Sequence, residues 1–170
     1  RLAISPEERR TLRLTARRTW RFFETFVTAA DHMLPPDNFQ EDPAPVLARR
    51  TSPTNLGLYL LSTVSARDFG WIGTVDAVEH DGGDHPQQRL NWYGTSDLRP
   101  LDPRYISSVD SGNLAGHLIA LANACREFRR AGAPPSMGIA DAVDLAREEA
   151  ALLNDVQRTQ TTTWRQLDGA

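Results

Sequence analysis

Apolar side chains recur at steps of three and four along several stretches of the chain, which is the spacing of an amphipathic helix. In the first such stretch the apolar positions are Leu12, Ala16, Trp20, Phe23 and Val27. The preceding Ser5-Pro6-Glu7-Glu8 has a serine N-cap, an early proline and a glutamate at the third helical position, which together form a capping box. We therefore predict a first helix within residues 1–34.

The polar side of this first helix is strongly basic. Its arginines are Arg9, Arg10, Arg13, Arg17, Arg18 and Arg21. A basic face can bind an anionic partner, but a solvated helix surface is the more common explanation, and it is the interpretation we favour.

A second helical pattern begins at Ser52-Pro53, again a cap followed by proline. Gly57 would let another helix approach closely, and Gly70 is the expected stop. A short third helix follows, so that residues 52–79 form a helical region. The predicted buried side of the longer helix consists of Leu56, Tyr59, Leu60, Thr63, Val64 and Ala66.

Two more helices are predicted, over residues 110–131 and 136–160. The first would be capped by Asp110 or Ser111, and Gly112 and Gly116 would allow close packing at its start. Its apolar seam consists of Leu114, Leu118, Leu121, Cys125 and Phe128, with His117 beside it. The inward face of the last helix is predicted to be Ile139, Val143, Ala146, Ala150, Leu153 and Val156.

The segment after the first helix is a polar loop over residues 35–51. Five prolines between positions 35 and 55 exclude a helix or a central strand there. Phe39, Val46 and Leu47 would anchor the loop, and Asp37 and Arg50 are positioned to form an ion pair. The residues that could bind a neutral polar ligand here are Asp37, Asn38, Gln40, Arg49, Arg50, Thr51, Ser52 and Asn55.

An aromatic loop region is predicted over residues 80–109, with Asn91-Trp92-Tyr93 at its centre. Aromatic rings stack on the apolar faces of sugars, and amides bond to their hydroxyl groups. Trp92 and Tyr93 could equally serve only to pin the loop to the core.

The turn before Asn91 contains His80, Asp81, Asp84 and His85, which are residue types that bind zinc. A flexible polar turn with two glycines fixes no ligand geometry, so we assign no metal site to it.

The composition narrows the possible functions. The chain has 170 residues, 40% of them hydrophobic, and a net charge of −3. This is ordinary globular composition, and it lacks the strongly basic charge that is typical of a nucleic-acid-binding protein.

The single cysteine of the chain excludes an internal disulfide and is compatible with a reducing compartment. No apolar run is long enough for a membrane span. The chain begins at Arg1, and we expect it to be a fragment of a longer protein.

These patterns predict an all-α fold in a single helical domain, 1–170. Long Pro-rich loops lead into the helix N-termini near Ser52 and Asp110. Helical hairpins with elaborate loops at one end are the arrangement expected of part of a helical toroid.

Several long motifs resemble bacterial cyclic β-1,2-glucan synthases. They are T-W-R-F-F-E-T-F-V, L-P-P-D-N-F-Q-E-D-P, R-R-T-S-P-T-N-L-G-L-Y-L-L-S, S-A-R-D-F-G-W-I-G, L-R-P-L-D-P-R-Y and S-S-V-D-S-G-N-L-A-G-H-L-I-A-L. The resemblance runs from Leu12 to Phe128 and matches the region after the membrane-embedded glycosyltransferase. It implies the first half of a glycoamylase-like (α/α)6 barrel, in which linear β-1,2-glucan is cyclised or transferred.

The resemblance also implies a parent in the bacterial inner membrane that uses UDP-glucose and a divalent metal in another domain. No cofactor is implied for this segment, which we expect to be soluble on the cytoplasmic side. Its implied partners are β-1,2-glucan and the remaining domains of the parent.

The chain departs from the family pattern in two respects. The short turn from His80 to Leu90 replaces a longer helix, and Gly94 replaces the aspartate of the family's aromatic motif. The barrel half expected to carry the catalytic carboxylates is not present, and Asp37 and Asp110 are the acidic candidates within matching motifs. Glycoside chemistry requires two carboxyl groups at a defined separation, and the sequence assigns no such pair.

Three hypotheses follow: a glucan-binding fragment of a carbohydrate-active enzyme that is inactive alone, a non-catalytic binding module, or a purely structural helical domain. Self-association through exposed apolar faces is expected for half a barrel. The predicted substrate-binding residues are Asp37, Asn38, Gln40, Arg50, Asn55, Asn91, Trp92, Tyr93, Asp110 and Asn113.

Overall fold

The computed structural model describes residues 3–81, 90–130 and 132–167, and in this part of the chain the fold is predominantly helical. Two antiparallel pairs of two-residue strands are the only sheet structure within those residues. The all-α prediction is therefore confirmed. The helices are α1 (Pro6–Phe26), α2 (Pro53–Phe69), α3 (Thr74–Asp81), α4 (Ser108–Phe128) and α5 (Gly138–Leu167).

The short strands organise the two loop regions. β1 (Phe39–Gln40) pairs with β2 (Val46–Leu47) to form a hairpin inside the first loop. β3 (Arg50–Thr51) pairs with β4 (Tyr93–Gly94), which brings the end of the first loop beside the aromatic motif of the second. This second pairing joins the two halves of the candidate site.

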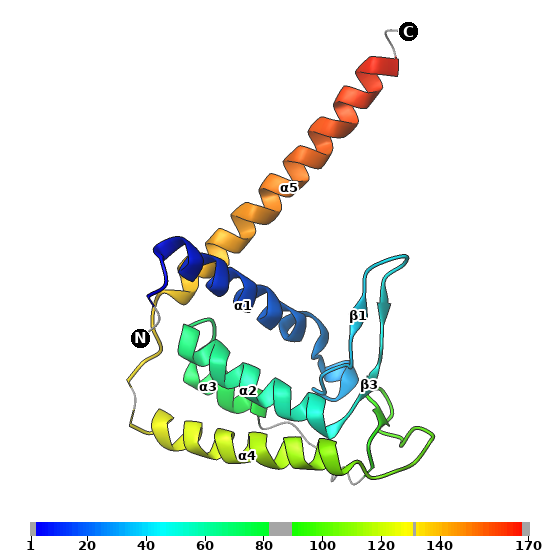
Figure 1. The fold of residues 1–170 in the computed structure, drawn as a ribbon, viewed down its shortest axis with the longest axis vertical. Helices are drawn as coiled ribbons and strands as arrows, with labels where there is room; N and C mark the ends of the chain where they lie inside the picture. The colour runs from blue at the N-terminus through cyan, green and yellow to red at the C-terminus, as the bar shows by residue number, and fades with distance from the viewer. Residues whose placement is uncertain (1–2, 82–89, 131, 168–170) are drawn as a thin grey trace.

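Helix α2 lies at the centre of the molecule (Figure 1). It packs against α4, α3 and α1, whereas α5 packs against α1 and then projects away from the other helices (Figure 1). The core between α1 and α2 contains Trp20, Val27, Tyr59 and Ala66.

The ends of α2 are as predicted. The Ser52 hydroxyl accepts a hydrogen bond from the Asn55 backbone N–H at 3.3 Å, and Gly70 ends the helix in the left-handed region with φ +78°. Gly57 lies against the His117 ring of α4, and a Cβ at this position would collide with it. The close helix approach predicted at Gly57 is therefore confirmed.

The first helix is shorter than predicted. The capping box at Ser5 and Glu8 is present, but α1 ends at Phe26 and a 3-10 turn follows at Ala29–Asp31. The backbone is already extended at Val27 and Thr28, two β-branched residues, which favour extended conformations. His32 and Met33 then take positive φ values, which excludes a continuous helix to residue 34.

The prediction for α4 was wrong at its start and for part of its face, since Leu114, Leu121 and Phe128 are half-buried. Ser107, not Asp110 or Ser111, is the N-cap, and its hydroxyl accepts from the Asp110 N–H at 3.1 Å. Leu118 and Cys125 are exposed, while His117 faces α2. Gly112 and Gly116 have no neighbour close to where a Cβ would lie, so they are not contact glycines within the described chain.

The predicted inward face of α5 was also wrong. Ile139, Val143 and Leu153 are exposed, Ala146 and Ala150 are exposed as well, and the side chain of Val156 lies outside the described residues. Among the described side chains of α5, the buried positions are Gly138, Asp141 and Leu145. The helix period was identified correctly, but the contacts of α5 with α1 are mainly between charged side chains, and Leu145 is the buried apolar residue of α5 among the described side chains.

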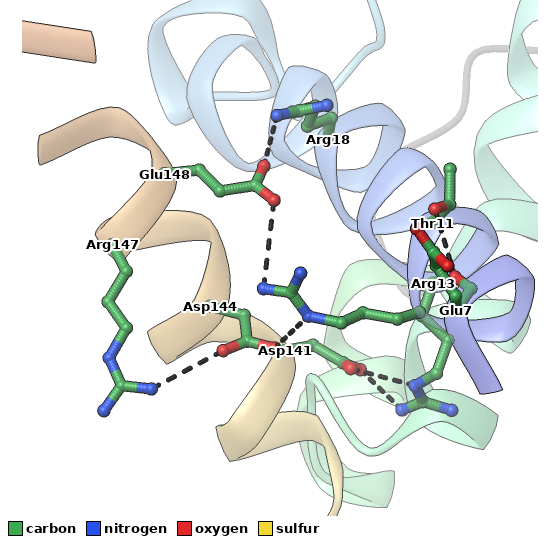
Figure 2. Close-up of polar contacts among 9 residues, drawn as sticks. Glu7, Thr11, Arg13, Arg18, Asp141, Asp144, Arg147 and Glu148 are labelled. Carbon is green, nitrogen blue, oxygen red and sulfur yellow. Dashed lines mark hydrogen bonds and ion pairs between the residues drawn. The ribbon is translucent and has the colours of Figure 1, made fainter. Parts of the chain in front are cut away.

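The basic face of α1 explains these contacts. Arg13 is held by Asp141 through two hydrogen bonds, of 2.8 Å from Nε and 2.5 Å from Nη2 (Figure 2). The interpretation of this face as solvated is confirmed for Arg9, Arg10, Arg18 and Arg21, which are exposed, whereas Arg13 and Arg17 are partly buried. The pairs across the two helices are Arg10–Asp144, Arg10–Glu148, Arg13–Asp141, Arg18–Glu148 and Arg21–Glu149.

None of the helices in the described part of the chain is both long enough and apolar enough to cross a membrane.

Candidate functional site

The polar residues predicted from the first loop meet at the N-terminal end of α2. The Asp37 carboxylate accepts from Arg50 Nε at 3.0 Å and from Arg50 Nη2 at 2.8 Å. Its other oxygen accepts from the Asn55 amide at 3.3 Å. The predicted Asp37–Arg50 ion pair is thus present, and it fixes the loop to the first turn of α2.

Arg50 also reaches the aromatic loop. Its guanidinium lies over the Trp92 ring, 4.8 Å from the centroid. Since Arg50 belongs to β3 and Trp92 directly precedes β4, the strand pairing holds the two side chains together. A cation over an indole face is favourable, and the half-buried Trp92 is the aromatic platform of the cluster.

The second candidate carboxylate approaches the same helix end from α4. Asp110 accepts from the Thr54 hydroxyl at 2.6 Å, and the Asn113 amide donates to that hydroxyl oxygen at 3.2 Å. Thr54 adjoins Asn55 in the first turn of α2, so neighbouring residues hold the two carboxylates. Asp37 and Asp110 therefore belong to one cluster.

Asn91 connects this cluster to the aromatic residues. In the orientation that satisfies both ends of its amide, the nitrogen donates to Asp110 Oδ2 at 2.8 Å. Its oxygen then accepts from Trp92 Nε1 at 2.9 Å and from the Tyr105 hydroxyl at 2.9 Å. Asn91 is only 3% exposed, so its amide connects neighbouring residues inside the fold and is not a surface group.

Three predicted site residues are placed differently. Tyr93 is buried in β4, and its hydroxyl accepts from the Leu90 N–H at 3.2 Å, so its ring pins the loop. Gln40 is exposed in β1, and among the described residues it makes no hydrogen bond to the cluster. Asn38 is exposed and donates to Asp37 at 3.2 Å, which places it at the edge.

Sequence reasoning missed a buried group behind the site. Asp31, 3% exposed, accepts from Thr95 Oγ1 at 2.7 Å and from Arg49 Nη1 at 2.5 Å. Burial alone would raise the pKa of Asp31, but the hydrogen bonds from Thr95 and Arg49 and the Arg49 charge outweigh it, so the pKa is lowered. This carboxylate ties the 3-10 turn to the residues flanking β3 and β4.

The histidine considered for a metal has another role. The ring nitrogen Nδ1 of His80 lies 2.6 Å from the Tyr59 hydroxyl, at the edge of the core. Asp84 and His85, and the side chain of Asp81, lie outside the described residues. Among the residues that are described, no three histidine, cysteine, aspartate or glutamate side chains form a metal-binding group.

Chemically, the cluster presents amides, hydroxyls, one exposed guanidinium and one aromatic face. Both carboxylates are engaged by neighbouring donors, and the Arg50 guanidinium offsets the charge of Asp37. Such a set is suited to hydroxyl groups of a neutral ligand.

Fold and site together define an all-α domain with a polar, aromatic loop cluster at one end of its central helix. No protein-family model matches the chain. The chain is 52% identical over 163 residues to cyclic beta-(1,2)-glucan synthase NdvB of Rhizobium meliloti (strain 1021). The match covers 91% of the chain but only 6% of that relative. The resemblance found in the motifs is thereby confirmed, and over these residues the chain belongs to the cyclic β-(1,2)-glucan synthase family.

Proposed function

We propose that this chain contributes a glucan-binding surface to a cyclic β-(1,2)-glucan synthase. One observation carries the proposal: the cluster of Asp37, Arg50, Asn55, Trp92 and Asp110 forms at one helix end from loops that are far apart in sequence. The similarity to a synthase of that glucan supports the choice of ligand. The bound glucan would place ring faces on Trp92 and hydroxyls on the surrounding polar groups.

We further propose that the chain corresponds to part of a glycoamylase-like helical toroid in a membrane-associated parent. Glucan cyclisation or transfer would then take place where this surface meets the rest of the parent. Glycosidic chemistry needs a general acid and a second carboxylate as nucleophile or base. Asp37 and Asp110 are both committed to hydrogen bonds within the cluster, so we expect the chain alone to bind glucan without cleaving or cyclising it.

Electrophoresis in gels containing linear β-(1,2)-glucan tests the binding. Retardation by this glucan, but not by an α-linked glucan of similar length, is expected, with a dissociation constant of about 1 mM. Trp92→Ala should abolish the retardation, because it removes the aromatic face. Equal mobility in gels with and without β-(1,2)-glucan would refute the proposal.

Turnover is tested separately by chromatography of linear glucan after incubation with the chain. No shortened or cyclic product is expected. Product that is formed by the chain and lost in Asp110→Ala would overturn the inactive assignment and make Asp110 a catalytic residue.

A specific observation favours a second candidate function, a purely structural one. The polar groups of the cluster bond largely to one another, which is what a clamp that orders two loops requires. In that case Trp92→Ala would lower stability and no glucan would bind to the unmodified chain.

A further inference from the structure

A second surface outside the loop cluster has the properties of a ligand site. It is an open cavity of about 480 Å³ between α1, the segment after β1, and α5. This volume is within the range of small-ligand sites, roughly 300–1,000 Å³. Its lining residues are Arg18, Arg21, Phe22, Thr25, Phe26, Phe39, Glu41 and Glu149, and we call it the phenylalanine groove.

Three aromatic rings form the apolar part of the groove. Phe26 and Phe39 have ring centroids 4.8 Å apart with planes at 38°, and Phe22 and Phe26 are 5.4 Å apart at 63°. All three side chains are only half-buried. The neighbouring Phe23, which is also half-buried, packs at 5.2 Å against Tyr59 of the core, and its ring centroid lies 5.3 Å from that of Phe22.

A role as a simple anchor for the hairpin does not account for this arrangement. An aromatic side chain that only anchors a hairpin stabilises the fold because it is removed from water. Tyr59 is an example, since it has no exposed surface. The rings of the groove are instead only half-buried, and they line a cavity. The β1–β2 hairpin and α5 project on the same side of α1 (Figure 1). Residues of α1, β1 and α5 line the groove.

The polar walls of the groove are balanced in charge. Arg21 is ion-paired with Glu149, and Arg18 is bonded to Glu148 at 2.5 Å, while Glu41 lies on the opposite wall. Guanidinium and carboxylate groups that form ion pairs can still make further hydrogen bonds. Their opposite charges offset each other, so they do not attract an ionic ligand strongly. This favours a neutral ligand that combines apolar faces with many hydroxyl groups.

We propose that the phenylalanine groove is a second carbohydrate-binding surface, which holds a neutral glucan chain with its ring faces against Phe22, Phe26 and Phe39. The inference deepens the proposed function and rests on it for the identity of the glucan. The two surfaces are joined by one short segment, in which Asp37 belongs to the loop cluster and Phe39 to the groove. A long polymer could contact both.

The test uses the 170-residue chain and linear β-(1,2)-glucan in affinity gels, with folding checked by circular dichroism. Phe39→Ala and Phe22→Ala should each weaken binding at least threefold, because each removes a ring from the groove. Phe39→Trp, which enlarges the platform, should strengthen binding. Phe128→Ala is the matched control, since Phe128 contacts Arg67 and does not line the groove.

The outcomes separate the two surfaces. One outcome is that binding is lost in Trp92→Ala but unchanged in folded Phe39→Ala, Phe22→Ala and Phe39→Trp. This would refute the groove as a glucan-binding surface and leave the proposed function standing. Binding that survives Trp92→Ala but weakens in the groove variants would support the groove and refute the loop cluster as a site. If the unmodified chain binds no glucan, both are refuted.

Discussion

Single residues in the loop cluster act by linking segments that would otherwise be independent. Asp37 joins the first loop to α2, and Asn91 joins the second loop to α4. Asp31 is buried behind them and holds the residues next to both strands. The positions of Arg50 and Trp92 therefore depend on several polar contacts in addition to apolar packing.

The ion pair between Asp37 and Arg50 can be measured by a double-mutant cycle. Alanine at either position should lower the free energy of unfolding, and the coupling between the two changes should be about 0.5–1 kcal/mol, because Arg50 is half exposed and the contact is two-pronged. Urea denaturation of the two single variants and the double variant gives the coupling. Strictly additive effects would show that the pair contributes nothing.

The cap of α4 gives a second residue-level prediction. Ser107→Ala should lower the free energy of unfolding by about 1 kcal/mol, since its hydroxyl accepts from the Asp110 N–H. Ser108→Ala, the same change one residue further on at an exposed position, is the control and should be nearly neutral. Equal effects of the two changes in urea denaturation would contradict the assignment of the cap.

At the scale of elements, the packing of α5 on α1 differs in kind from the packing of α2. Helix α2 buries Leu56, Tyr59, Leu60 and Ala66 in the ordinary way. The α1–α5 contact is instead dominated by arginine–carboxylate pairs, most of them partly exposed (Figure 2). Exposed ion pairs contribute little each, so this interface depends on its most buried member, Arg13–Asp141.

This contrast explains how far the sequence could predict the fold. The period of three and four identified α1, α2, α4 and α5, and the serine, proline and glycine signals located the ends of α2. Periodicity did not identify the contact face of α5, because apolar residues there remain exposed and the carboxylates between them face α1. Ser107 and Asp31 were missed for a related reason. A helix cap and a buried carboxylate are identified from the groups that they contact, and only the fold brings those groups together.

Asp141→Ala tests the central pair of the interface. Asp141 accepts from Arg13 and also from Trp71 Nε1 at 2.8 Å, so its removal leaves two partly buried donors without their partner. We expect a loss of about 2 kcal/mol in the free energy of unfolding. Asp144→Ala is the matched control one helical turn away, and it should cost less than about 1 kcal/mol because Arg10 is 57% exposed. Similar losses in both variants would contradict the prediction.

The same carboxylate should make the interface sensitive to acid. Burial would raise the pKa of Asp141, but hydrogen bonds from Arg13 and Trp71 and the charges of Arg13 and Arg17 outweigh it, so the folded-state pKa lies below the ordinary value of 3.8. A carboxyl group with a lowered pKa stabilises the fold fully above its unfolded value and loses that contribution as the pH falls through the folded value. The difference in stability between the unmodified chain and Asp141→Asn should therefore shrink below pH 3.8, and a difference independent of pH would exclude this linkage.

Large apolar side chains are exposed on several helices of the molecule, among them α4 and α5. Ile119 of α4 is 67% exposed and Ile139 of α5 is 71% exposed, and Leu152 of α5 is 63% exposed. Large apolar side chains that remain exposed can mark a surface that a partner covers. The matching relative is far longer than this chain, so in a parent of that length other segments could cover these faces.

In the chain alone these faces have to meet water or one another, and we expect concentration-dependent self-association. Sedimentation velocity should show an average mass above that of the monomer as the concentration rises. Ile119→Asp should reduce the association, because it places a charge on the apolar face of α4, whereas Asn123→Asp adds the same charge at another exposed position of that helix and serves as the control. Association should also persist or strengthen at high salt, since apolar contacts are not screened and ion pairs are. A monomer at all concentrations would show that these exposed faces need no covering, and it would remove this support for the half-barrel arrangement.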